Sequence, residues 1–162
     1  MSGGHAPSVE LDARGLRVHI VASQWHQEVM DALVAGAVAA CEKAGATLDI
    51  TRVPGAFELP LGCQRVSNIA KVDAIVALGV VIRGGTPHFE YVCSAATEGI
   101  MRVMLDQGIP IGFGLLTVDT EDQARDRAGL PTSREDKGAE AVEAALSMAI
   151  AHRSPSTTVG FG

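Results

Sequence analysis

Residues 72–82 read VDAIVALGVVI, and residues 83–88, directly after them, read RGGTPH. The first stretch is a nearly continuous apolar run rich in Val and Ile, which is typical of a strand buried on both faces of a parallel sheet. The second stretch has two glycines followed by Thr86 and Pro87, residues that suit a tight turn and the start of a helix. Together they predict a buried strand that runs directly into a helix.

The same alternation extends along the rest of the chain. Short apolar or alternating runs predict three further strands, at residues 16–22, 47–53 and 109–118. Apolar residues at helical spacing predict helices at about residues 27–44, 58–69, 87–107, 120–128 and 132–152. The last two helices are expected to open with capping boxes, TEDQ at 120–123 and TSRE at 132–135. This order predicts an α/β protein, a three-layer α/β/α sandwich with a central four-stranded parallel sheet.

The length and composition fit one domain. The chain has 162 residues, of which 47% are hydrophobic and 20% charged, so we expect a packed core and not a disordered chain. The predicted domain spans residues 15–152. The polar, Gly- and Pro-containing residues 1–14 are expected to form a flexible N-terminal arm, and residues 153–162 a flexible C-terminal tail.

The charge balance excludes several classes of partner. A net charge of −6 argues against nucleic acid and anionic membranes, because both require a basic surface. No apolar run approaches the roughly 20 residues of a membrane span, and the N-terminus lacks the pattern of a signal peptide. Cys41, Cys63 and Cys93 lie in apolar, helix-like contexts and indicate reduced core thiols. We therefore expect a cytoplasmic protein.

The carboxyl ends of parallel strands meet at one edge of a sheet, where ligands of open α/β folds bind. Four segments should lie there: residues 23–27, 54–58, 83–88 and 113–120. In the third, the glycines expose backbone N–H groups, Thr86 can cap the helix and Pro87 suits its first position. A helix N-terminus of this kind attracts anions, although a capped turn without a ligand would look the same. A P-loop is excluded, because Gly85 stands where its lysine must be.

His88 is the candidate catalytic residue. It falls in the first turn of the expected helix, where the helix dipole favours the neutral imidazole, which can accept a proton. The alternative is a structural or merely exposed histidine. His5, His19, His26 and His152 lack such a position. Nothing in the sequence matches a Ser-His-Asp triad or a metal-ligand spacing, so we expect neither a metal nor another cofactor.

Aromatic residues are scarce, yet Trp25, Phe57 and Phe113 fall at or beside the ends of three expected strands. A flat heteroaromatic ligand needs such surfaces for stacking. The alternative is that they cover the edge of the core. Glu58 could accept hydrogen bonds from a polyhydroxyl chain, or it could stabilise its own helix.

Residues 77–91, ALGVVIRGGTPHFEY, closely resemble the signature of the lumazine synthase family. Further motifs agree in order and spacing: ASQWH at 22–26, GAFELP at 55–60, and DRAG at 126–129 followed by DKG at 136–138. The resemblance covers about residues 14–152 and implies a flavodoxin-like strand order. It also implies the condensation of 5-amino-6-(D-ribitylamino)uracil with 3,4-dihydroxy-2-butanone 4-phosphate, without a cofactor, in riboflavin biosynthesis.

The resemblance also implies residue roles. The expected ribitylaminouracil-binding residues are Trp25, Ala56, Phe57, Glu58, Val80, Val81, Ile82, Phe113 and Lys137. The expected phosphate-binding residues are Gly84, Gly85, Thr86 and Arg127, and His88 moves protons. Sites of the family lie between subunits, so Phe113, Arg127 and Lys137 should come from a neighbouring copy. By composition alone, Arg127 and Lys137 would be ordinary surface charges.

The family forms homopentamers, some of which build sixty-subunit icosahedral shells. The slightly long link at residues 129–138 favours free pentamers by analogy, and riboflavin synthase is a further expected partner. Three alternatives stay open: an idle flavin or lumazine carrier, a shell protein, and a riboflavin synthase relative that dismutates lumazine. The presence of both His88 and Arg127 favours the condensing enzyme, since a carrier needs neither.

Overall fold

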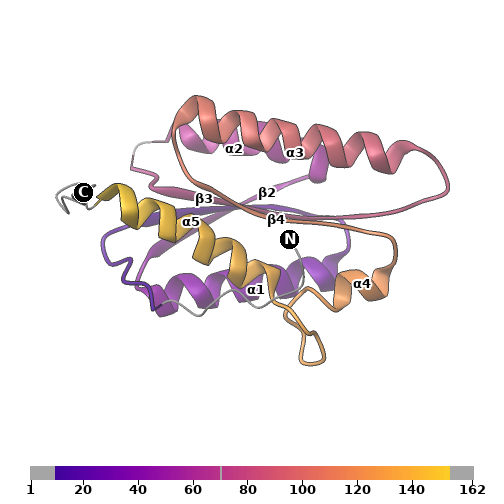
Figure 1. The fold of residues 1–162 in the computed structure, drawn as a ribbon, viewed down its shortest axis with the longest axis horizontal. Coiled ribbons are helices and arrows are strands. Elements are labelled where there is room, and N and C mark those ends of the chain that lie inside the picture. The colour runs from indigo at the N-terminus through magenta and orange to yellow at the C-terminus, as the bar shows by residue number, and fades with distance from the viewer. Residues whose placement is uncertain (1–9, 70, 154–162) are drawn as a thin grey trace, which may run out of the picture.

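The computed structural model describes residues 10–69 and 71–153, which form one sheet between two layers of helices (Figure 1). The elements in chain order are β1 Arg17–Ser23, α1 Gln27–Ala44, β2 Thr47–Val53, the 3-10 helix η1 Ala56–Glu58, α2 Leu59–Ser67, β3 Ala74–Ile82, α3 His88–Gln107, β4 Ile111–Val118, α4 Glu121–Arg125 and α5 Lys137–Arg153. This sequence of elements confirms the predicted alternation of strands and helices.

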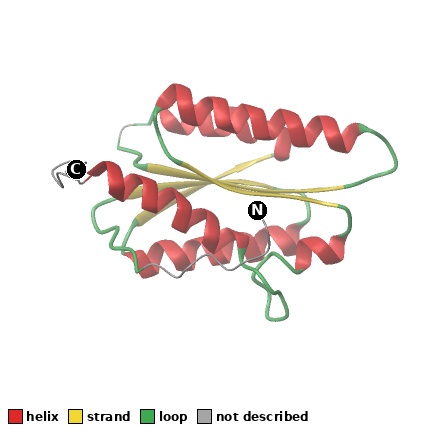
Figure 2. Cartoon of the chain, viewed as in Figure 1, coloured by secondary structure: helices red, strands yellow, loops and turns green. Residues whose placement is uncertain are grey.

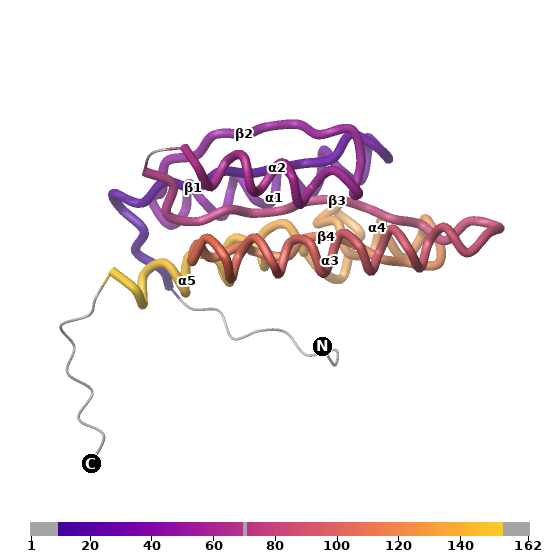
Figure 3. Tube along the Cα trace, turned by 90° about the horizontal axis from the view of Figure 1, so that it is seen from above, coloured from indigo at the N-terminus to yellow at the C-terminus, as the bar shows by residue number. Residues whose placement is uncertain are grey.

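The sheet is parallel throughout, with strand order β2-β1-β3-β4. Helices α2 and α3 cover one face, and α1, α4 and α5 cover the other (Figure 2). Seen from above, α2 lies over the β1–β2 side of the sheet and α3 over the β3–β4 side (Figure 3). The predicted three-layer sandwich with flavodoxin-like strand order is therefore confirmed.

Strand β3 is central to both halves of the core. Its apolar residues alternate between the two layers: Val76 and Leu78 pack with α1 and α5, whereas Ile75 and Ala77 pack with α2 and α3. Helix α5 lies directly on β4. A Cβ at Gly112 would be only 2.0 Å from the carbonyl oxygen of Ala141, which shows how closely the two elements approach. Because all strand pairs are parallel, the carboxyl ends of the four strands lie at one edge of the sheet.

One of the two expected capping boxes is formed in part: Thr120 caps the helix, but the Gln123 side chain accepts from Asp119 N–H, at 2.8 Å, and not from Thr120 N–H. The hydroxyl oxygen of Thr120 accepts a 3.2 Å hydrogen bond from the backbone N–H of Gln123, and α4 begins directly after Thr120. The box expected at 132–135 is wrong, because α5 begins only at Lys137. The carboxylate of Asp136 accepts the hydrogen bond from Ala139 N–H, at 2.9 Å.

Contacts with residues outside 132–135 explain the later start of α5. Residues 126–136 turn back on themselves, with an antiparallel bridge between Ala128 and Asp136 and a 3.1 Å bond from Glu135 N–H to the carbonyl oxygen of Asp126. Lys137 N–H, which a helix from 132 would need for its own hydrogen bonds, donates instead to the carbonyl oxygen of Arg127 at 3.0 Å. The start of α3 also differs from expectation, since Pro87 is its cap residue and Thr86 makes no side-chain cap.

Residues 10–14, expected to belong to the arm, pack on the body of the protein. Ala13 is fully buried, and its N–H donates to the carbonyl oxygen of Ala44 at 2.8 Å. The Arg153 guanidinium donates to the carbonyl oxygens of Arg14 and Asp12, at 2.8 and 3.1 Å. The rest of the expected arm and the tail after Arg153 lie outside the described residues. Among the described helices, none has the length and apolar character needed to cross a bilayer.

Candidate functional site

A cavity of about 390 Å³ opens at the carboxyl edge of the sheet. Three of the four expected segments meet there, following β1, β2 and β3. The lining residues are Trp25, His26, Gly55, Ala56, Phe57, Glu58, Val80, Val81, Ile82, His88 and Val92. The predicted convergence of strand ends therefore holds for these three segments.

Trp25 and Glu58 both lie against the turn after β2. A Cβ at Gly55 would be 3.3 Å from Cδ1 of Trp25 and 3.3 Å from Oε2 of Glu58. The bare backbone of Gly55 thus lets the indole and the carboxylate approach the same place. Trp25 is 69% exposed and Phe57 62% exposed, so both rings present large faces to the cavity region.

His26 is a lining residue that the sequence prediction missed. It has left-handed backbone angles, φ 61° and ψ 64°, which are uncommon for a residue other than glycine. Its carbonyl oxygen accepts from Met30 N–H at 2.9 Å, at the first turn of α1. The available signal was its position directly after Trp25, in a segment that follows a strand.

The loop from Arg83 to Pro87 joins two lining residues, Ile82 and His88, but its own residues, including the expected Gly84, Gly85 and Thr86, do not line the cavity. Gly84, Gly85 and Thr86 are exposed, and a Cβ at either glycine would meet nothing within 4 Å. His88 is the first residue of α3 and is also exposed, with Glu90 N–H bonded to the carbonyl oxygen of Pro87. An anion placed at this loop would lie at the positive end of a 20-residue helix.

Arg127 and Lys137, two of the expected site residues, do not line this cavity. Arg127 donates from Nη1 to the carbonyl oxygen of Gln123 at 2.9 Å, and its Nε is 3.8 Å from Glu135. Lys137 pairs with Glu140 at 2.7 Å and with Glu135 at 3.5 Å. Neither residue lines the cavity of its own chain.

The expected position of Phe113 at a strand end is wrong. Phe113 is the third residue of β4, opposite Ala77, because most of the segment expected at the edge lies inside that strand. The ring is 47% exposed on an edge strand, away from the carboxyl end. One chain therefore brings together eight expected residues: Trp25, Ala56, Phe57, Glu58, Val80, Val81, Ile82 and His88.

Comparison with known proteins shows the family of this chain. The family model described as 6,7-dimethyl-8-ribityllumazine synthase matches residues 15–153. The chain belongs to the 6,7-dimethyl-8-ribityllumazine synthase family. The resemblance noted for about residues 14–152 is thereby confirmed.

Proteins with that family's name are similar over nearly their whole length. The protein from Kineococcus radiotolerans is 60% identical over 155 residues, which cover 94% of this chain and 95% of the relative. The one from Leifsonia xyli subsp. xyli is 57% identical over 156 residues, 95% and 98% of the two chains. The one from Clavibacter michiganensis subsp. michiganensis is 55% identical over 157 residues, again 95% and 98%.

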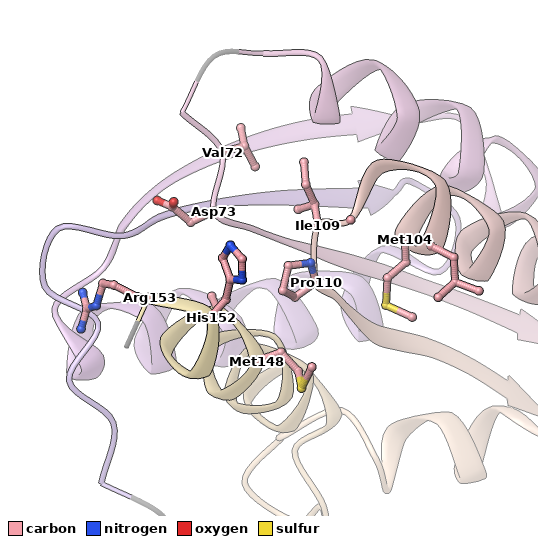
Figure 4. Close-up of a pocket in the computed structure, with 11 residues that line it drawn as sticks. Val72, Asp73, Met104, Ile109, Pro110, Met148, His152 and Arg153 are labelled. Carbon is pink, nitrogen blue, oxygen red and sulfur yellow. The ribbon is translucent and has the colours of Figure 1, made fainter. Parts of the chain in front are cut away.

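A larger cavity, of about 620 Å³, lies at the opposite edge of the sheet (Figure 4). Its walls are mostly apolar, with Met104 from α3 and Met148 and His152 from α5. The guanidinium of Arg153, at its border, is already bonded to two carbonyl oxygens. Because α/β sheets bind ligands at the carboxyl ends of their strands, the smaller cavity is the candidate site for this family member.

Among the described residues, the two buried thiols do not form a second reactive centre. Burial raises the pKa of the Cys63 thiol to about 12 and that of Cys41 to about 11, so neither forms a thiolate near neutral pH. Both lie in the core, as predicted, whereas Cys93, also expected there, is only half-buried, so the prediction is wrong for Cys93. The bond to Glu140 raises the pKa of Lys137, which keeps its ammonium charged. In the part of the chain that the structure describes, no three His, Cys, Asp or Glu side chains are grouped to hold a metal ion.

Proposed function

We propose that this protein condenses 5-amino-6-(D-ribitylamino)uracil with 3,4-dihydroxy-2-butanone 4-phosphate to give 6,7-dimethyl-8-ribityllumazine. One observation carries the proposal: an indole, a carboxylate and an imidazole line one cavity, beside an exposed glycine loop at a helix N-terminus. The names of the relatives support the same product. The cavity and the adjacent loop offer suitable groups for a planar pyrimidine, a polyhydroxyl chain and a phosphate.

The reaction requires the protein mainly to position the two substrates and to transfer protons. The aromatic amine of the uracil attacks the ketone, and loss of water gives a Schiff base. Phosphate then leaves, and ring closure with loss of a second water completes the lumazine. Both reactants are reactive already, so holding them in register supplies much of the rate enhancement. His88 accepts and returns protons during these steps.

The proposed binding roles are those that the family resemblance implies. Trp25 stacks on the pyrimidine, while the backbone of Val80, Val81 and Ile82 reads its polar edge. Ala56, Phe57 and Glu58 hold the ribityl chain, with the Glu58 carboxylate accepting from its hydroxyls. Gly84, Gly85 and Thr86 hold the phosphate, together with Arg127.

We infer that the complete site forms between copies of the chain in a free homopentamer, in preference to a sixty-subunit shell. Helix α3 supports the association of copies, since only three of its 20 residues are buried, Ala96, Ile100 and Val103. Its Tyr91 and Leu105 are 74% and 71% exposed, which leaves a large apolar surface for a neighbour. Phe113, Arg127 and Lys137, which lie outside the cavity of their own chain, then join the site of the adjacent subunit.

Two further expectations belong to this proposal. The enzyme works in the cytoplasm, as its reduced core thiols suggest. Riboflavin synthase, which consumes the lumazine, is a potential partner of the assembly. Sedimentation velocity tests the assembly itself, because a species of five chains supports the inference and a monomer or a sixty-subunit particle contradicts it.

The activity is tested by mixing the purified protein with both substrates and following lumazine absorbance together with phosphate release. His88→Ala should slow turnover far more than it weakens ribitylaminouracil binding. His152→Ala, an exposed histidine at the other edge of the sheet, is the matched control and should behave as wild type. Turnover of lumazine alone would indicate the dismutating relative, and tight lumazine binding without turnover would indicate the carrier.

A further inference from the structure

Arg83 joins the three elements that surround the glycine loop. Its backbone N–H donates to the carbonyl oxygen of Val118 at 2.9 Å, and its Nε donates to Oδ1 of Asp119 at 2.7 Å. Its Nη1 pairs with the carboxylate of Glu90, in the first turn of α3. The guanidinium also lies over the ring of Phe89, 4.3 Å from its centre. One side chain thus connects the ends of β3 and β4 to the start of α3.

These contacts argue against direct binding of phosphate by Arg83. An arginine beside a glycine loop at a helix N-terminus would ordinarily be taken for an anion ligand. Here its guanidinium is bonded to two carboxylates, and the three charges sum to −1. Arg83 in turn holds the pKa of Glu90 below its usual value, so this carboxylate stays ionised. The cluster as a whole would not attract a phosphate.

The loop itself has little else to hold it in place. Gly84 and Gly85 have no neighbours at the position of a Cβ, and the residues from Gly84 to His88 are exposed. Its two ends are therefore fixed by the contacts of Arg83 on one side and by the first turn of α3 on the other. Small displacements of such a loop matter, because an error of about 1 Å in substrate placement can cost roughly a hundredfold in rate.

We propose that Arg83 is a positioning residue, which acts through Glu90 and Asp119 to fix the phosphate-binding loop and His88 relative to the sheet. This inference rests on the proposed function, in which the loop binds the phosphate of the four-carbon substrate. Arg83 does not touch the substrate.

The deciding experiment neutralises the two carboxylates and leaves Arg83 in place. The double variant Glu90→Gln/Asp119→Asn removes two negative charges, so a directly phosphate-binding Arg83 would then bind more tightly. A positioning Arg83 loses its anchors, and the KM for the butanone phosphate should rise roughly tenfold, while the KM for ribitylaminouracil changes less than about twofold. Adding Arg83→Gln to this variant should change the KM by no more than about twofold, since the same function is already lost.

The matched control is Arg102→Gln, which breaks an exposed arginine–aspartate pair within α3 and should leave both KM values unchanged. A lower KM for the butanone phosphate in the double variant, or an independent effect of Arg83→Gln in that background, would overturn the proposal.

A second measurement does not depend on the reaction. Amide hydrogen exchange of Arg83 and Glu90, whose N–H groups are hydrogen-bonded, should be about tenfold faster in the double variant and unchanged in Arg102→Gln. If the wild-type protein does not convert the two substrates, the proposed function fails, yet exchange still reports whether Arg83 holds the loop. Unchanged exchange in the double variant would contradict the positioning role.

Discussion

Nε2 of His19 lies 2.7 Å from Oγ1 of Thr51, and this contact joins β1 to the edge strand β2. His19 is only 9% exposed. Burial lowers the pKa of His19 below its usual value of 6.5, with Asp49 acting in the opposite direction and Arg17 in the same one. The folded protein therefore favours a neutral imidazole at this position.

This relationship predicts a loss of stability in mild acid. The unfolded chain binds more protons than the folded one between the folded-state and unfolded-state pKa values of His19. The stability that the neutral ring contributes is therefore fully present above about pH 6.5. It is lost as the pH falls through the lower pKa of His19 in the folded protein. In thermal unfolding, His19→Gln should show a smaller drop between neutral and acidic buffer than wild type. His152→Gln should show the wild-type drop, and equal drops in all three proteins would contradict the prediction.

The correction at the start of α5 predicts a pair of unequal substitutions. Asp136→Ala removes the carboxylate that accepts from Ala139 N–H, and loss of such a cap costs about 1 kcal/mol. Thr132→Ala should be nearly neutral, because the capping box at 132–135 is not formed. Denaturant unfolding of both variants measures the difference. A larger loss in Thr132→Ala than in Asp136→Ala would restore the original expectation.

Glu58→Gln tests recognition of the ribityl chain. An ionised acceptor contributes about 1.5–3 kcal/mol to a hydrogen bond, so the KM for ribitylaminouracil should rise roughly tenfold or more. The KM for the butanone phosphate should stay close to wild type. Glu42→Gln, an exposed acid on α1, serves as the control. Similar changes in both KM values would remove Glu58 from a specific role in binding the uracil substrate.

Arg127→Ala tests whether a residue outside the cavity of its own chain takes part in the site. Loss of a charge-assisted phosphate contact should raise the KM for the butanone phosphate by roughly tenfold or more, with little change for the other substrate. Arg65→Ala, an exposed arginine in α2, is the control. If the requirement for the butanone phosphate does not change, Arg127 does not bind the phosphate.

Local sequence patterns predicted the elements well where a single periodicity decides them. The bounds of α1 follow from buried residues at helical spacing and from Gly45, whose positive φ ends the helix. The bounds of β2 were also predicted correctly. The predicted strand at 109–118 began two residues early, because Ile109 is apolar and packs on the core without joining β4.

Features that depend on distant contacts were harder to predict. Hydrogen bonds to Asp126 form the turn that precedes α5. No pattern within residues 132–135 indicates these bonds. His26 lines the cavity and has a left-handed backbone, which no local pattern indicated. The two carboxylates that pair with Arg83 belong to Asp119, directly after β4, and to Glu90, at the start of α3.

The sparse burial of α3 also bears on how the stability of this protein should be measured. If copies of the chain cover its exposed side chains, folding and assembly become linked by mass action. The melting temperature should then rise with total protein concentration, and a single free energy of unfolding would not describe the protein. Dilution below the dissociation range would expose Tyr91 and Leu105 together, and the isolated chains would become prone to aggregation and proteolysis.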